Sequence, residues 1–135
     1  MPVSYEEISK VALDLLTATA CTEAGLRSSI SRAYYGLYHA SLEYADTISV
    51  PPVSDTSGPV HAKLGAYYQN HVHLDKQVRL NLRQIGWSLK GLHEIRCNAD
   101  YRLDEVVTHI DAEAMYQRCA SKIALVQQLM AAKAA

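Results

Sequence analysis

The chain has 135 residues with no phenylalanine, one tryptophan and only three cysteines. Because the cysteines are odd in number and widely spaced, they argue against a disulfide framework and fit a reducing compartment. No stretch of about 18 consecutive apolar residues occurs, so we expect no membrane span. The first residues lack a basic segment followed by an apolar one, so we expect no secretory signal. These absences favour a cytoplasmic protein without a membrane partner.

The sequence also lacks an excess of charge of either sign, since its formal net charge is −1. The chain therefore lacks the overall positive charge that many nucleic-acid binders carry. The net charge does not exclude a local basic patch. Hydrophobic residues make up 49% and charged residues 20%, which is typical of soluble globular domains. A chain of this length can bury a sufficient hydrophobic core without disulfide bonds, so residues 1–135 are expected to form one domain.

Several motifs that carry chemistry are missing. No glycine-rich phosphate loop and no serine in a glycine-flanked elbow occurs, and no cysteine has an evident histidine partner. His71 and His73 are two residues apart, but no cysteine pair or HExxH helix accompanies them. We interpret them as part of a solvated loop, and we predict neither a metal site nor a cofactor.

Apolar residues recur every three or four positions through most of the chain, which predicts helices. No segment alternates with period two for long enough to predict a strand. Three prolines and a glycine mark residues 49–59 as a loop. The connections are otherwise short, so the pattern predicts an all-α fold, an up-and-down bundle of four to five helices. The expected helices are one that follows Ser4 and extends through at least Leu16, and then about 22–46, 60–70, 76–98 and 109–133.

Local signals mark where some helices begin and where they pack. Ser4 and Asp75 are expected N-caps, and Thr108 with Asp111 resembles a capping box. Residues 101–107 are expected to form a loop. Gly86 and Gly91 interrupt the fourth helical pattern, and both are expected to mark close contacts between helices.

Polar and charged groups gather where the fourth predicted helix ends, in the sequence Arg96-Cys-Asn-Ala-Asp-Tyr-Arg102. Arg96 follows an apolar helix face, and a buried arginine needs a partner. Asp100 lies one helical turn later, within reach of an ion pair. Two interpretations stay open: the pair locks the end of the helix, or Arg96 binds phosphate through its planar fork.

Nine tyrosines supply nearly all the aromatic side chains, and Tyr34, Tyr35 and Tyr38 cover more than one face of the second predicted helix. Core packing, with each hydroxyl reaching a partner, is one interpretation. Base stacking in a nucleotide cleft is the other. His39 follows Tyr35 by one turn, and His93 precedes Arg96 by three residues. For each histidine, a structural hydrogen bond and a place in a cleft both stay open.

Two segments together resemble the HEPN family, the "higher eukaryotes and prokaryotes nucleotide-binding" domains. They are Ser31-Arg-Ala-Tyr-Tyr-Gly-Leu-Tyr-His-Ala40 and Arg96-x-x-Ala-Asp-Tyr101. His61, at the start of the third predicted helix, also fits the layout of the family. The resemblance implies a helical homodimer in a toxin–antitoxin or defence-type module, with a nucleotidyltransferase-like antitoxin as the partner protein.

The same resemblance implies a ligand and a reaction. Ribonucleases of the family cleave RNA without metal, using an arginine and a histidine with four to six residues between them. After Arg96 this spacing leads to Tyr101, Arg102 or Leu103, and none of these is histidine. Arg102 and His109, with six residues between them, are the candidate catalytic pair. The candidate residues for binding RNA or nucleotide are Arg32, Tyr35, His39, Arg96, Asp100 and Tyr101.

We therefore expect a HEPN-like protein that binds RNA or nucleotide, with metal-independent endoribonuclease activity as an open possibility. The alternative is a non-catalytic helical dimer that acts as a protein-interaction module, in which the polar cluster holds two long helices together. A related possibility is that an exposed tyrosine-rich surface binds a partner chain.

Overall fold

The computed structural model describes residues 3–134, which form an all-α bundle without a strand in that range. The expected fold class is thereby confirmed. The elements are α1 (Tyr5–Thr17), α2 (Glu23–Ile48), a short 3-10 turn η1 (Val53–Asp55), α3 (Val60–Asn70), α4 (Lys76–Tyr101) and α5 (His109–Ala134).

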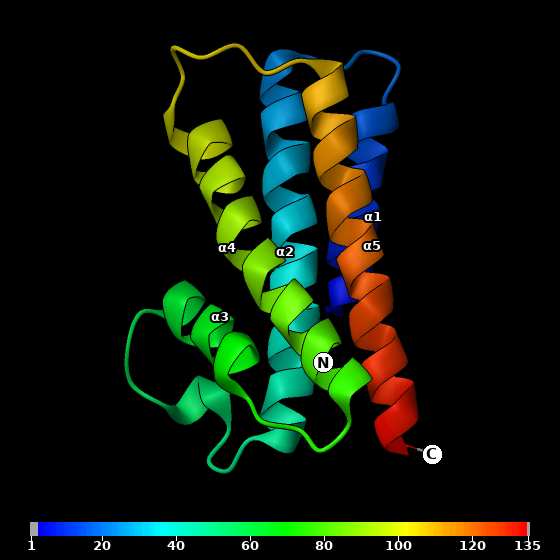
Figure 1. The fold of residues 1–135 in the computed structure, drawn as a ribbon. Helices are drawn as coiled ribbons and strands as arrows, with labels where there is room; N and C mark the ends of the chain where they lie inside the picture. The colour runs from blue at the N-terminus through cyan, green and yellow to red at the C-terminus, as the bar shows by residue number, and fades with distance from the viewer. Residues whose placement is uncertain (1–2, 135) are drawn as a thin grey trace.

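The four longest stretches of helix run antiparallel to their neighbours in the chain, and α2 lies at the centre of the bundle (Figure 1). The helices α1, α4 and α5 surround α2, whereas the shorter α3 packs on the outside against α4. Near the end that carries the α4–α5 connection, α4 leans away from α5 (Figure 1). Side chains of α2 contact those of both α3 and α4.

Side-chain caps begin the helices where the sequence predicted them. Ser4, Thr22 and Asp75 each accept a hydrogen bond from a backbone N–H in the first turn of the helix that follows. Thr108 and Asp111 form the expected reciprocal box, in which each side chain accepts from the other residue's N–H, at 3.2 Å and 3.0 Å. These contacts satisfy N–H groups that have no partner inside the helix.

The structure differs from the prediction at the end of α4 and inside the loop 49–59. The helix α4 continues to Tyr101, three residues beyond the expected end at 98, so Tyr101 is helical and not part of the loop. Ala99 is 2% exposed and packs in the core, and an ion pair spans the last turn of α4 from Arg96 to Asp100. Within the expected loop 49–59, Val53 is 3% exposed, and its burial accompanies the short turn η1.

Tyrosine supplies the aromatic rings of the core. Tyr34 and Tyr68 are 1% and 0% exposed, and both hydroxyls have partners. The hydroxyl of Tyr68 donates to the carbonyl of Ser41 at 2.6 Å. A buried polar group that keeps a hydrogen bond avoids most of its desolvation penalty. Core packing with a bonded hydroxyl, one of the two interpretations of the tyrosines, therefore holds for these two residues.

The two glycines of α4 have different surroundings. A Cβ atom on Gly86 would lie 3.1 Å from the carbonyl oxygen of Gly65 and 2.8 Å from Cγ of Gln69. Gly86 therefore lets α3 and α4 approach each other closely, as predicted. A Cβ atom on Gly91 would meet nothing within 4 Å, so the expected close contact at Gly91 is wrong. Gly91 instead faces open space.

Arg27, near the start of α2, forms hydrogen bonds with the backbone of the α4–α5 connection. Its guanidinium donates to the carbonyls of Ala99 at 2.8 Å and Arg102 at 3.1 Å, and also to the carbonyl of Glu105. Glu23 accepts from Arg27 at 3.2 Å and from the N–H of Val107 at 2.8 Å. The hydrogen bond from Val107 lowers the pKa of Glu23, with smaller contributions from Arg27.

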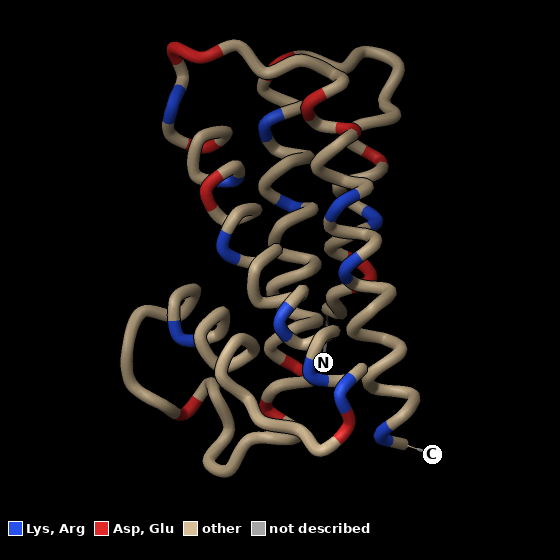
Figure 2. Tube along the Cα trace, in the orientation of Figure 1, with Lys and Arg blue, Asp and Glu red and all other residues tan. Residues whose placement is uncertain are grey.

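Charged residues of both signs are distributed over the bundle (Figure 2). They are ordered along α5, where Asp111 and Glu113 lie near the start and the cationic residues follow from Arg118 onward. Between residues 3 and 134, no helix is both long enough and apolar enough to cross a membrane.

Candidate functional site

Polar and aromatic side chains from three helices meet between α2, α4 and the start of α3. Arg96 lies at the centre of this group, which we call the Arg96 cluster. The cluster consists of Ser31, Tyr34, Tyr35 and Tyr38 from α2, His61 from α3, and His93, Arg96 and Asp100 from α4.

Arg96 is 7% exposed, and its guanidinium bridges two residues of α4. One terminal nitrogen lies 3.2 Å from Oδ2 of Asp100, and the other lies 3.1 Å from Nε2 of His93. The hydroxyl of Ser31 donates to the same oxygen of Asp100 at 3.3 Å. The third nitrogen, Nε, is buried without a hydrogen-bond partner among the described residues. The buried guanidinium of Arg96 therefore has one N–H donor without a partner among the described residues.

The contact with Arg96 fixes the protonation state of His93. A guanidinium can only donate, so Nε2 of His93 must accept and the ring carries its proton on Nδ1. Burial lowers the pKa of His93, and the positive charge of Arg96 lowers it further, against a smaller opposing effect of Glu94. His93 is therefore neutral at neutral pH.

His61 reaches the cluster from the start of α3. Its Nδ1 lies 2.7 Å from the hydroxyl of Tyr34, and its ring stacks on His93 with centroids 4.3 Å apart. Burial, followed by the nearby His93 and Arg96, lowers the pKa of His61 from 6.5 to about 4. Two neutral imidazoles thus lie side by side near a guanidinium. Neutral imidazoles can accept a proton, and arginine can stabilise negative charge.

Aromatic rings surround the cation and extend toward the surface. The guanidinium of Arg96 lies 5.3 Å from the ring centroid of Tyr35 and 5.8 Å from that of Tyr34, distances typical of cation–π contacts. The guanidinium of the exposed Arg32 lies 5.2 Å from the ring centroid of the same tyrosine, Tyr35. His39 is also exposed and lies 6.2 Å from Tyr35 between centroids. Burial and the charge of Arg32 lower the pKa of His39.

The fold brings five of the six expected binding residues into this one region, namely Arg32, Tyr35, His39, Arg96 and Asp100. The sixth, Tyr101, is the last residue of α4 and is 75% exposed. Among the contacts within residues 3–134, none joins Tyr101 to the Arg96 cluster.

The expected catalytic pair lies at the end of the bundle where α4 connects to α5. Arg102 is the C-cap of α4, and its carbonyl accepts from Arg27. His109 begins α5, where Nε2 lies 3.2 Å from the carbonyl of Leu16 and Nδ1 lies 3.7 Å from Glu113. No hydrogen bond or ion pair within residues 3–134 joins Arg102 to His109. Their role as a pair stays a prediction.

Five members of the cluster were not among the predicted site residues: Ser31, Tyr34, Tyr38, His61 and His93. The three-residue spacing from His93 to Arg96 was a usable signal, since it places both on one helix face. The contact between Tyr34 and His61 joins residues on opposite sides of the loop 49–59, so no local pattern could reveal it.

A groove of about 520 Å³ between α3 and α4 passes beside the two histidines, which line it together with Lys90 and Glu94. No group of three or more histidine, cysteine, aspartate or glutamate residues in the described range is arranged to hold a metal ion. The reactive groups of the region are the guanidinium, the imidazoles, the phenols, the carboxylate of Asp100 and the thiol of Cys97. The sulfur of Cys97 lies 3.6 Å from Nε2 of His93, a cysteine–histidine contact that the sequence did not reveal.

Comparison of the chain with protein-family models, curated proteins and solved structures finds no significant match.

Proposed function

We propose that this chain is a HEPN-like protein that binds RNA or nucleotide at the Arg96 cluster. The observation that carries the proposal is the buried guanidinium of Arg96, whose Nε lacks a partner among the described residues. Arginine recognises phosphate through several N–H donors at once, and a partly unused guanidinium favours such a ligand. The exposed Arg32 supplies a second cation, 5.2 Å from the ring centroid of Tyr35.

Tyr35 and the two residues that contact it on the surface each have a role in this binding mode. Arg32 attracts the phosphate backbone from solution, and Tyr35 offers a ring on which an unpaired base stacks. His39, also exposed, lies beside Tyr35 and can hydrogen-bond a ribose hydroxyl. Single-stranded RNA fits this surface better than a duplex, because unstacked bases can reach an aromatic ring.

The proposal extends to the biological setting that the resemblance to the HEPN family implies. The chain would act as the HEPN member of a toxin–antitoxin or defence-type module, as a homodimer with a nucleotidyltransferase-like antitoxin. Its support is the pair of segments 31–40 and 96–101, which supply most members of one spatial cluster.

Metal-independent endoribonuclease activity is part of the proposal. A neutral histidine would take the proton of a ribose 2′-hydroxyl, and the oxygen would attack the adjacent phosphorus. The same histidine would pass this proton, directly or through water, to the departing 5′-oxygen as its bond to phosphorus breaks, leaving a 2′,3′-cyclic phosphate and a 5′-hydroxyl. Within the cluster His93 would be the base through Nε2, which lies 3.1 Å from the guanidinium and is released when Arg96 donates to the phosphate instead. Arg102 with His109 is the competing pair from the sequence.

RNA binding can be measured by the fluorescence anisotropy of a labelled single-stranded oligoribonucleotide. Arg32→Ala should weaken binding about tenfold, because it removes one phosphate contact. Arg83→Ala removes an exposed arginine elsewhere on α4 and should leave binding nearly unchanged. Equal affinities of the wild type and Arg32→Ala, or no binding by the wild type, would refute the proposed site.

Cleavage can be tested in chelator with the same RNA. His93→Gln should abolish product if the Arg96 cluster is catalytic, whereas His109→Ala should abolish it if the Arg102–His109 pair is. Circular dichroism of both variants would show that they fold. Binding without cleavage by the wild type would restrict the function to binding.

A second candidate function is a non-catalytic interaction module, a helical dimer in which the cluster only holds α2, α3 and α4 together. The observation that favours it is the pairing within the cluster, where Arg96 already contacts Asp100 and His93. Under this alternative, Arg96→Met would lower stability without any RNA binding to lose. The anisotropy measurement on the wild type therefore separates the two functions.

A further inference from the structure

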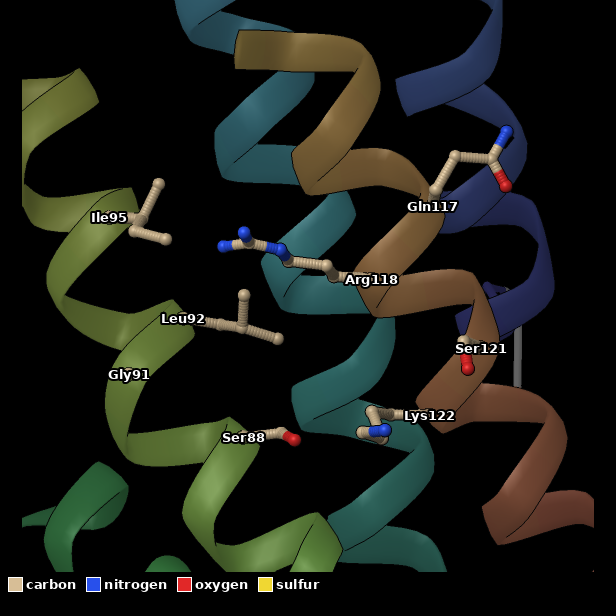
Figure 3. Close-up of a pocket in the computed structure, with 8 residues that line it drawn as sticks. All are labelled: Ser88, Gly91, Leu92, Ile95, Gln117, Arg118, Ser121 and Lys122. Atoms are coloured by element: carbon tan, nitrogen blue, oxygen red, sulfur yellow. The ribbon is translucent and has the colours of Figure 1, made fainter.

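A long groove lies between α4 and α5, away from the Arg96 cluster. Its larger part has a volume of about 550 Å³, and Figure 3 shows how its walls are made. The side chains of Leu92 and Ile95 point from α4 toward α5, while Arg118 reaches back from α5 toward α4. A second hollow of about 290 Å³ is also lined by Ile95 and Arg118, so the two hollows adjoin along the groove between α4 and α5.

The dimensions of the groove match a short helix. Along α4 it extends from Ser88 to Ala99, and along α5 from Lys122 back to Asp111. At 1.5 Å per residue each wall is roughly 16 Å long, or about three helical turns. Gly91 lines the groove and has nothing within 4 Å of where its Cβ would lie, which leaves room for a side chain of a partner.

Apolar side chains remain exposed beside the groove. Val106 lines the smaller hollow and is 78% exposed, and Ile110, on α5 one turn before the lining residue Ala114, is 77% exposed. Trp87, one turn before Gly91 on α4, is 76% exposed. Exposed apolar residues grouped around a groove are typical of interaction sites.

Charge distinguishes one end of the groove from the other. Arg118 and Lys122 line the larger part, and neither forms an ion pair within residues 3–134. Glu105 and Asp111 line the opposite end. This arrangement corresponds to the order of charges along α5 in Figure 2. A ligand with negative charge at one end only would complement it, whereas a uniformly anionic polymer would meet the two carboxylates.

We propose that the α4–α5 groove binds an amphipathic helix of a partner protein, with acidic side chains facing Arg118 and Lys122. Apolar residues on one face of that helix would cover Leu92 and Ile95 and pack beside Trp87, as in other helix-in-groove complexes. This site is separate from RNA binding at the Arg96 cluster, because it lies between α4 and α5 and not between α2, α3 and α4.

Trp87 is the single tryptophan of the chain and lies one turn before the lining residue Gly91, so its fluorescence can report on a ligand that extends to this end of the groove. The probe is a synthetic helical peptide of about 14 residues, with leucine at every third or fourth position. Glutamate occupies the terminal turn that would face Arg118 and Lys122. Its binding should shift the fluorescence of Trp87 to shorter wavelength. A peptide with the same leucines but lysine in place of glutamate should bind at least about tenfold more weakly.

Three variants locate the binding. The double variant Arg118→Glu with Lys122→Glu should weaken binding of the acidic peptide at least about tenfold and improve binding of the basic peptide. Lys76→Glu changes an exposed cation at the start of α4, far along the helix from the groove, and should have no effect. Gly91→Leu fills the groove and should abolish binding without lowering stability, because leucine is a better helix former than glycine.

Four outcomes would overturn the proposal. They are no fluorescence shift with the acidic peptide, equal affinity for both peptides, unchanged binding by Gly91→Leu, and a shift on dilution alone. The last would show that a second copy of the chain already covers Trp87. Quenching of Trp87 by single-stranded RNA, lost in the double variant, would instead assign the groove to nucleic acid.

Discussion

The hydroxyl of Tyr34 lies 2.7 Å from Nδ1 of His61, and this contact joins the middle of α2 to the first turn of α3. Tyr34 is 1% exposed, so its phenol has a partner only because the loop 49–59 returns the chain to this point. Burial raises the pKa of Tyr34, so the hydroxyl stays protonated and can donate to His61. The hydrogen bond thereby leaves Nε2 of His61 to carry the ring proton.

Tyr34→Phe removes this donor and leaves Nδ1 of His61 without a partner. The free energy of unfolding, measured by urea denaturation, should fall by about 1–2 kcal/mol. Tyr116→Phe is the matched control, since Tyr116 is half-buried and forms no side-chain hydrogen bond within residues 3–134. An equal loss in both variants would mean that the Tyr34–His61 contact contributes nothing specific.

The stability of the protein should depend on pH through His61. Its pKa is about 4 in the folded protein and 6.5 ordinarily, so the unfolded chain binds more protons between these values. The contribution of neutral His61 is complete above pH 6.5 and is lost as the pH falls toward about 4. The urea midpoint should therefore decrease through this window, and His61→Gln should make that decrease shallower. Parallel pH profiles for the two proteins would contradict the burial of a neutral His61.

The two glycines of α4 should respond oppositely to alanine. Gly86→Ala places a methyl group 3.1 Å from the carbonyl oxygen of Gly65, so α3 and α4 must separate, at a cost of about 1–3 kcal/mol. Gly91→Ala meets no neighbour and should stabilise the helix by about 0.5–1 kcal/mol. Thermal unfolding of both variants tests the difference, and a stabilised Gly86→Ala would show that the helices have room to move.

Arg27→Gln should loosen the α4–α5 connection. The guanidinium donates to carbonyls of three residues there, and glutamine can replace only part of that set. We expect a loss of about 2–3 kcal/mol in unfolding free energy. Hydrogen exchange at Val107, whose N–H is held by Glu23, should become faster. Unchanged exchange at Val107 would show that Arg27 does not order this segment.

The sequence predicted the fold closely because its signals are local. Caps such as Asp75 and Thr108 act within one turn, and apolar periodicity belongs to single helices. The last turn of α4 was missed because Ala99 is buried by tertiary packing and its carbonyl accepts from Arg27 of α2, which a single-helix pattern cannot show.

Prediction of the site was less complete for a related reason. Arg96 and Asp100 were found together because they are four residues apart on one helix. His61 was recognised only through the layout of a family, since it meets Tyr34 and His93 through tertiary packing. The different environments of Gly86 and Gly91 likewise follow from where α3 crosses α4, not from the sequence around either glycine.

The use of tyrosine in place of phenylalanine sets an alkaline limit on this fold. Burial raises the pKa of Tyr68 and of Tyr34, whereas the same phenols in the unfolded chain ionise near pH 10. The unfolded chain therefore loses protons that the folded protein retains, and stability must fall as the pH rises above about 10. Phenolate absorbance should consequently appear in two stages: exposed rings titrate first, and the buried rings ionise abruptly when the bundle opens.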